Sequence, residues 1–183
     1  EVRKFIAKNL SSGDVLVDIG ANLGVFSLYA VAKSDVGRVI SIEPMAANYL
    51  YLNRNIRLNG WENRVQSLCV AVSDFSGFAS FNIQDESTGA AANSLGQGDE
   101  LYTDEGFRVK TRLVVPTNTL DNICEYFEVV PKLIKIDTDG HELEVLRGAQ
   151  RLLSNSTLRF LAIEVQGANH SKVRALLAGF NFK

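Results

Sequence analysis

The sequence contains few cysteines and prolines and no long apolar stretch. Of its 183 residues, two are cysteine and three are proline. Cys69 and Cys124 both lie in apolar segments, which predicts buried, reduced thiols and gives no basis for a disulfide framework. No apolar run reaches the roughly 20 residues that a membrane-spanning helix needs, and no signal peptide is recognisable. We therefore expect a cytoplasmic protein.

The chain also lacks an excess of charge of either sign. Lysine and arginine number 19 and acidic residues 21, which gives a formal net charge of −2. This near balance does not predict a nucleic-acid or membrane surface as the main partner. Hydrophobic residues make up 46% of the chain, enough for one substantial core, so we predict a single domain over residues 1–183. The first residue is not methionine, and an apolar segment at 179–182 resembles the start of a strand, so we expect both ends to be trimmed.

Short apolar runs alternate with amphipathic segments along the chain. Compact apolar runs typical of buried parallel strands occupy 15–19, 39–42, 65–72, 133–137 and 160–165. Segments with helical spacing or composition occupy 2–10, 25–33, 45–56, 120–127, 139–153 and 170–178. This alternation predicts an α/β fold, namely a Rossmann-like, doubly wound and mostly parallel sheet.

One insertion interrupts the alternation before the strand at 133–137. Segments 78–83 and 108–115 are predicted to be additional strands that pair as a hairpin. The stretch from Asp85 to Gly106 between them is rich in Gly, Ser, Thr and Asp and is predicted to be a long loop. Loops of this length are often functional lids, so it is our candidate lid and specificity element.

Several candidate ligand-binding residues end the predicted strands. They are Asp18, Glu43, Ala71, Asp137 and Glu164. Because ligands of doubly wound sheets bind at the carboxyl ends of the strands, we expect these residues to line one crevice.

A glycine turn follows the first predicted strand, in the stretch from Asp18 to Gly24. Gly20 allows the backbone to approach a ligand closely, and Gly24 allows tight packing of helix on strand. The dinucleotide pattern would require glycine at position 22, where this chain has Asn22. An acid at position 18 suits a ligand that carries an ammonium or sulfonium charge rather than a diphosphate.

Glu43 ends the second predicted strand, where a carboxylate can accept both hydroxyls of a ribose. NAD and S-adenosylmethionine (SAM) both carry such a ribose. Together with the turn at Asp18, Glu43 favours SAM. The alternative is that Asp18 and Glu43 only cap helices or pair with basic residues.

An ordered set of motifs resembles one known family. It comprises Asp18-Ile-Gly-Ala-Asn-Leu-Gly24, Glu43-Pro44, Ala71-Val-Ser-Asp74 with Gly77, Thr119-Leu-Asp121, Leu133-Ile-Lys-Ile-Asp-Thr-Asp-Gly140 with Glu142, and Val145-Leu-Arg-Gly-Ala149. In this order, from about residue 10 to 165, the motifs resemble the FkbM family of methyltransferases. The resemblance implies a fold of the class I SAM-dependent methyltransferase type and transfer of a methyl group to a hydroxyl of a small molecule, sugar or glycan.

The resemblance also implies roles for individual residues. It assigns Asp18, Gly20, Asn22 and Gly24 to the methionine end of SAM, Glu43 to the ribose, and the segment from Ala71 to Asp74 to the adenine edge. The family has Val-Glu-Gly where this chain has Thr138-Asp139-Gly140, which puts the identity of the acceptor in doubt but not the binding of SAM.

Asp137 is the leading catalytic candidate, and His141 is the second. Asp137 ends the strand across the switch point from Asp18, so it should lie near the transferable methyl group and could accept a proton from a hydroxyl. The alternative for Asp137 is a structural carboxylate that binds backbone amides. Asp139 and Glu142 fit a helix capping box, with Asp139 at the N-cap. Asp137, Asp139, His141 and Glu164 could ligate Mg²⁺, but their spacing does not require an ion, and we predict no metal site.

Two other functions share parts of this pattern. An NAD-dependent oxidoreductase would share the fold and Glu43 but needs the missing dinucleotide glycines. A non-catalytic SAM-binding or scaffold domain is the second alternative, since the sequence identifies no acceptor. The oligomeric state is not predicted.

Overall fold

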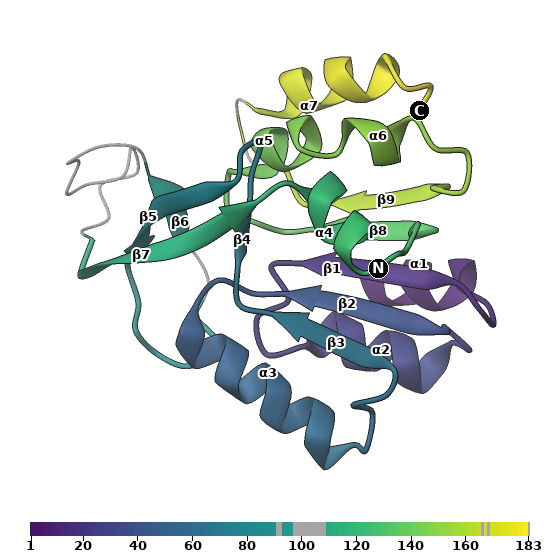
Figure 1. The fold of residues 1–183 in the computed structure, drawn as a ribbon, viewed down its shortest axis with the longest axis horizontal. Coiled ribbons are helices and arrows are strands. Elements are labelled where there is room, and N and C mark those ends of the chain that lie inside the picture. The colour runs from purple at the N-terminus through teal and green to yellow at the C-terminus, as the bar shows by residue number, and fades with distance from the viewer. Residues whose placement is uncertain (91–92, 97–108, 166, 168, 183) are drawn as a thin grey trace.

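A five-stranded parallel sheet forms the centre of the protein. The computed structural model describes residues 1–90, 93–96, 109–165, 167 and 169–182. The strands lie in the order β3-β2-β1-β8-β9, and every neighbouring pair is parallel (Figure 1). Their bounds are β1 Val15–Ile19, β2 Arg38–Ile42, β3 Val65–Leu68, β8 Leu133–Ile136 and β9 Phe160–Ile163. The order reverses between β1 and β8, which is the topological switch point.

Helices cover both faces of this sheet, which confirms the doubly wound prediction. On one face lie α1 (Val2–Asn9), α2 (Val25–Lys33) and α3 (Ala46–Leu58). On the other lie α4 (Leu120–Tyr126), α5 (Glu142–Arg147), α6 (Gln150–Leu153) and α7 (Asn169–Ala178). No helix in the described ranges is long and apolar enough to cross a bilayer.

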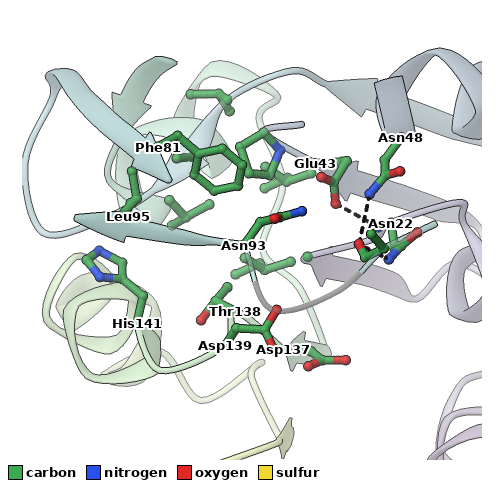
Figure 2. Close-up of a pocket in the computed structure, with 18 residues that line it drawn as sticks. Asn22, Glu43, Asn48, Phe81, Asn93, Leu95, Asp137, Thr138, Asp139 and His141 are labelled. Carbon is green, nitrogen blue, oxygen red and sulfur yellow. Dashed lines mark hydrogen bonds between the residues drawn. The ribbon is translucent and has the colours of Figure 1, made fainter. Parts of the chain in front are cut away.

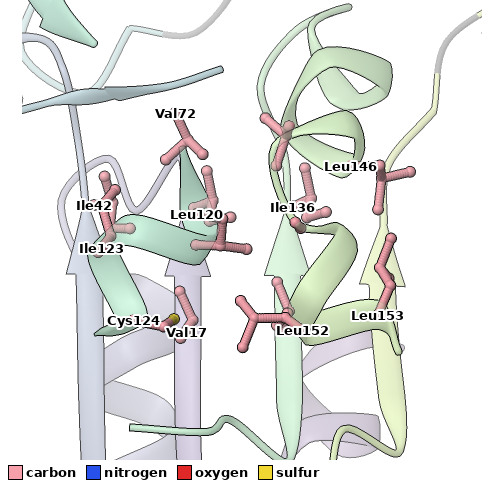
Figure 3. Close-up of a cluster of buried hydrophobic side chains, with 14 of the residues drawn as sticks. Val17, Ile42, Val72, Leu120, Ile123, Cys124, Ile136, Leu146, Leu152 and Leu153 are labelled. Carbon is pink, nitrogen blue, oxygen red and sulfur yellow. The ribbon is translucent and has the colours of Figure 1, made fainter. Parts of the chain in front are cut away.

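The core consists of one apolar layer on each face, because side chains along a strand alternate between the faces. Val17, Ile42 and Ile136 point to the layer under α4 to α7, where they pack with Leu120, Cys124, Leu146, Leu152 and neighbouring residues (Figure 3). Leu16, Val39 and Leu133 point to the layer under α1 to α3. Burial on both faces explains why these strands are mostly apolar, with Asp18, Ser41 and Lys135 as buried polar exceptions.

A second, four-stranded sheet projects from the carboxyl ends of the central strands (Figure 1). Its order is β4-β7-β5-β6, with β4 at Ala71–Val72, β5 at Gly77–Ile83, β6 at Ser94–Gly96 and β7 at Thr111–Asn118. Strands β5 and β7 are antiparallel neighbours, which confirms the predicted pairing. They are not a simple hairpin, because β6 lies between them in the chain, and β7 ends three residues later than predicted.

Two predictions in this region need correction. The strand predicted over 65–72 is two strands, β3 and β4, which belong to different sheets. The segment from Asp85 to Gly106 is not loop throughout, because it contains β6, which pairs with β5. Residues 91–92 and 97–106 of this candidate lid lie outside the described residues.

The helix predicted over 139–153 is also corrected. It is two helices, α5 and α6, separated near Gly148, where a β-carbon would lie 2.1 Å from the carbonyl oxygen of Ser73. The capping box is wrong: α5 begins at Glu142, with His141 at the N-cap and no side-chain capping bond, while Asp139 has a left-handed φ of 51°.

Two smaller expectations are also revised. Residues 179–181 form a turn, and no strand begins within 179–182. Both cysteines are free, but only Cys124 is fully buried, because Cys69 is half-buried. Burial raises the pKa of Cys124 to about 12, and the nearby Asp121 charge adds to this shift.

Candidate functional site

The turn after β1 brings the ends of β1, β2 and β8 together. The backbone amides of Gly20 and Ala21 donate to the Ile42 carbonyl at 3.0 and 2.9 Å. Gly20 has a φ of +70°, and a β-carbon there would lie 1.8 Å from the Asp137 carbonyl oxygen. Glycine is therefore required by both conformation and space.

Gly24 has a different role from the predicted one. It precedes α2 with a φ of +89°, and a β-carbon there would meet the Leu52 side chain of α3 at 2.6 Å. Gly24 thus allows α2 and α3 to pack closely, rather than α2 and a strand.

Glu43 is held rigidly at the carboxyl end of β2. Its Oε2 accepts a hydrogen bond from the Asn22 amide at 2.8 Å, and its Oε1 accepts one from the Met45 amide at 2.9 Å. Burial raises the pKa of Glu43, and the two backbone hydrogen bonds and Lys135 oppose this shift. Each oxygen keeps a second lone pair, so the carboxylate can still accept from a ligand.

A cavity of about 110 Å³, which we call the first cavity, lies at the carboxyl ends of β1, β2 and β8 (Figure 2). Asn22, Glu43 and Asn48 lie at one end of it, and His141 lies at the other. Its apolar walls come from both sheets and comprise Ile19, Ile42, Val70, Ala71, Val72, Phe81 and Leu95. The site combines apolar walls with a few fixed polar groups, which is typical of small-molecule sites.

A short segment, residues 87–90, crosses beside the Glu43 end of this cavity, and we call it the strap. The amide of Gly89 donates to Asn48 Oδ1 at 2.8 Å, and Asn48 Nδ2 donates to the Ala90 carbonyl at 3.4 Å. Asn22 Nδ2 lies 3.2 and 3.3 Å from the Gly89 and Ala90 carbonyls. Asn22, from the turn after β1, and Asn48, from α3, thus hold the part of the predicted lid that the strap represents.

Asp18 lies beneath the first cavity and does not line it. It is fully buried, accepts a 2.6 Å hydrogen bond from the Ser27 hydroxyl, and pairs with Lys135, whose Nζ lies 3.3 Å from its Oδ1. The same Nζ lies 3.3 Å from Asp137 Oδ2 and donates to the Gly20 carbonyl at 3.0 Å. Burial alone lowers the pKa of Lys135, but Asp18 and Asp137 outweigh it and the pKa is raised.

Asp137 lines two cavities at once. The second cavity, of about 580 Å³, lies on the α1 and α2 side of β8 and β9 and is lined in part by Phe5, Phe26, Leu161 and Glu164. Glu164 therefore faces the second cavity and not the first, so the prediction that all five strand-end residues line one crevice is corrected for Glu164 and Asp18.

His141 lines the first cavity and contacts the end of β4. Its Nε2 lies 3.0 Å from the Ser73 hydroxyl, and its Nδ1 lies 3.7 Å from Glu144 Oε2. Burial lowers the pKa of His141, while Glu144 and Asp74 oppose the shift. Ala71 lines the first cavity, whereas Asp74 is exposed and lines neither cavity.

Glu142 organises the loop between β8 and α5. Its side chain is fully buried, and its Oε1 accepts from the amides of Thr138 and Gly140, at 3.3 and 2.9 Å, and from the Thr138 hydroxyl at 3.1 Å. Within the described part of the chain, no three His, Cys, Asp or Glu side chains gather in a group that could hold a metal ion.

Sequence reasoning missed Lys135, Asn48, Ser27 and the role of Glu142. For Lys135 a signal was present, because a single charge in an apolar strand must be paired when it is buried. Asn48 gave no such signal, since its partners lie on a segment distant in the sequence.

Comparison with solved structures identifies the class of fold. A methyltransferase FkbM from Methylobacillus flagellatus aligns with a TM-score of 0.58 and 20% identity, over 93% of this chain and 36% of its own. A precorrin-6y C5,15-methyltransferase from Geobacter metallireducens aligns with a TM-score of 0.58 and 12% identity, over 100% of this chain and 71% of its own. The fold is therefore the Rossmann-like fold of class I methyltransferases.

Sequence comparison then identifies the family. The model of the methyltransferase FkbM domain matches residues 18–183, so the chain belongs to the FkbM methyltransferase family. The methyltransferase sdnD of Sordaria araneosa is 28% identical over 160 residues, and the hexuronic acid methyltransferase AglP of Haloferax volcanii is 29% identical over 181 residues. These matches cover 76% and 97% of this chain, and 62% and 67% of the two relatives.

Proposed function

We propose that this protein binds SAM in the first cavity and transfers its methyl group to a hydroxyl of a small molecule, sugar or glycan. The observation that carries the proposal is the fixed Glu43 carboxylate, which lies across the same cavity from Asp137 (Figure 2). Membership of the FkbM family supports methyl transfer. When bound, SAM supplies a methyl group on a sulfonium centre.

The residues of the first cavity fit the parts of SAM. The lone pairs left on Glu43 suit the two ribose hydroxyls. Apolar walls that include Ile42, Ala71 and Phe81 suit the faces of an adenine ring. The Gly20 turn and the Asp137 carboxylate suit the methionine end, since a carboxylate attracts the positive sulfonium. Asp18 supports this end from below, through Lys135.

Asp137 is our candidate for the base that accepts the proton of the acceptor hydroxyl. Its side chain is 32% exposed and it borders both cavities, so it can face a cofactor in one and an acceptor in the other. The ion pair with Lys135 engages Oδ2, so we assign Oδ1 to the proton. The second cavity, of about 580 Å³, borders Asp137 on the side opposite the first cavity and is our candidate acceptor site.

The acceptor class rests on the relatives and on the lining of this cavity. AglP acts on a hexuronic acid by its name, which supports a sugar acceptor. Phe5 and Phe26 can pack against the apolar face of a sugar ring, while Asp137 can accept from its hydroxyls. His141 is the second candidate for proton transfer, and it would serve an acceptor that enters the first cavity, which it lines. Burial lowers the pKa of His141, which favours the neutral imidazole that a base requires.

Isothermal titration with SAM and with its demethylated product, S-adenosylhomocysteine (SAH), tests the proposal. We expect the wild-type protein to bind both ligands. We expect Glu43→Ala to weaken both by roughly 2 kcal/mol or more, because hydrogen bonds to a buried charged group are lost. Lys132→Met serves as a control, since Lys132 pairs with Asp14 at the opposite end of β8 and β1. Folded wild-type protein that binds neither ligand would refute the proposal.

The same sample distinguishes the two alternative functions. An NAD-dependent oxidoreductase would quench or enhance NADH fluorescence on titration, and we expect no change. A non-catalytic SAM-binding domain would bind SAM tightly but release no SAH with any of a panel of neutral sugars, hexuronic acids and glycosides. Release of SAH with one acceptor class, lost in Asp137→Asn, is the expected result.

A further inference from the structure

Lys135 carries a buried ammonium that connects three parts of the site. The residue is 3% exposed, and its Nζ contacts Asp18 on β1, Asp137 after β8 and the Gly20 carbonyl in the glycine turn. The ring of Phe26 on α2 covers it, with Nζ 4.8 Å from the ring centroid. A buried charge is strongly disfavoured unless it is paired, so these contacts fix the ammonium in one place.

The two carboxylates that share this ammonium differ in their surroundings. Asp18 is fully buried, and the Ser27 hydroxyl that donates to its Oδ2 lies 2.7 Å from the Ser41 hydroxyl. Asp137 is partly exposed and borders both cavities. Two carboxylates and one ammonium have a formal charge of minus one. Because Asp18 is enclosed, this excess charge reaches the cavities through Asp137.

We propose that Lys135 is a positioning residue of this site, which holds the Asp137 carboxylate at the boundary of the two cavities and leaves one net negative charge facing a cationic ligand. The proposal rests on the proposed function, because SAM carries the sulfonium charge that SAH lacks. A negative charge held close to the sulfonium favours SAM over SAH and so favours exchange of product for fresh cofactor.

A simpler role for Lys135 would be to neutralise Asp18 within the core. The two roles differ in what they predict for Asp137. If Lys135 only neutralises Asp18, then removing both charges together leaves Asp137 unaffected. If Lys135 positions Asp137, the same double change releases the Asp137 side chain although the core contains no unpaired charge.

The test therefore uses the double variant Asp18→Asn/Lys135→Met, which avoids the unpaired buried carboxylate that Lys135→Met alone would leave. SAM and SAH affinities are measured by isothermal titration, and the Asp137 χ1 angle is measured by NMR from three-bond couplings. The double variant keeps the net charge of minus one, so a change in preference reports where the Asp137 carboxylate lies and not how much charge is present. We expect rotamer averaging at Asp137 and a fall in the SAM-to-SAH preference on the order of tenfold, because the carboxylate is no longer held beside the sulfonium and is partly screened. SAH itself should still bind.

The matched control is Asp14→Asn/Lys132→Met, which removes the ion pair at the opposite ends of the same two strands, where Nζ and Oδ2 are 2.7 Å apart. We expect this control to keep both the preference and a single Asp137 rotamer. The proposal would be overturned if Asp18→Asn/Lys135→Met also kept both the SAM-to-SAH preference and a single Asp137 rotamer. If wild-type protein binds neither ligand, the proposed function fails, and the χ1 measurement still decides whether Lys135 positions Asp137.

Discussion

Replacing Gly20 by alanine tests how closely the ends of β1 and β8 approach each other. The added methyl carbon would lie 1.8 Å from the Asp137 carbonyl oxygen, so β8 must move away from β1. A left-handed backbone costs a non-glycine residue about 1–2 kcal/mol, and overpacking of a dense core costs about 1–3 kcal/mol more. We therefore expect Gly20→Ala to lower the free energy of unfolding by about 2–5 kcal/mol.

Gly60 provides a matched control for this experiment. It has nearly the same backbone conformation, with a φ of +68°, but a β-carbon there would meet no atom within 4 Å. Gly60→Ala should therefore show only the backbone contribution, about 1–2 kcal/mol. Urea denaturation followed by circular dichroism measures both variants, and SAM titration then shows whether Gly20→Ala also loses the ligand. Equal loss of stability in the two variants would refute the close approach of β1 and β8.

Three further predictions concern groups whose environment the structure defines. Burial raises the pKa of Glu43 above 4.5, so SAM affinity should fall on acidification, with a midpoint above pH 4.5, as the carboxylate is protonated. Titration calorimetry from pH 7 to 4 should show this fall in the wild type and not in Glu43→Gln. Asn48→Ala removes two hydrogen bonds to the strap, so stopped-flow fluorescence should show SAM dissociation faster by about tenfold, and an unchanged rate would contradict a role for the strap in retention. Because burial raises the pKa of Cys124 to about 12, its alkylation by iodoacetamide at pH 8 should occur only through unfolding, and labelling of the folded protein at the rate of a free thiol would contradict that burial.

The sequence predicted the central sheet well because its strands are buried on both faces. Runs such as Val15–Ile19 and Leu133–Ile136 are recognisable as strands because each is short and contains only one charged residue. The glycine turn after β1 marks the switch point. Glu43 and Asp137 were placed correctly at one cavity because parallel strands end at one edge of the sheet. Asn22 and Ala71 also line this cavity, but Asn22 comes from the turn after β1 and Ala71 from β4 of the second sheet.

The missed features depend on contacts between distant parts of the chain. Helical spacing over 139–153 does not reveal that Gly148 must lie against the Ser73 carbonyl, which interrupts the helix. The motif at Asp139 and Glu142 resembles a capping box, but Glu142 folds back into the core and binds the loop before it. Asp18 fits a ligand-binding position by its place in the motif, whereas its side chain points to the face of the sheet that α2 covers, as the hydrogen bond from Ser27 shows.

The ion pair between Asp18 and Lys135 also has a consequence for how the sheet assembles. The two residues are directly opposite each other in the pairing of β1 and β8, on a face where Ser27 and Ser41 are the other buried polar neighbours of Asp18. Shifting one strand by a single residue would turn its charge to the opposite face, among the isoleucines and valines under α4 to α7, while its partner stayed behind unpaired. Misaligned pairings of the two strands would therefore be penalised during folding, and the same lysine that supports the ligand site would select the correct register.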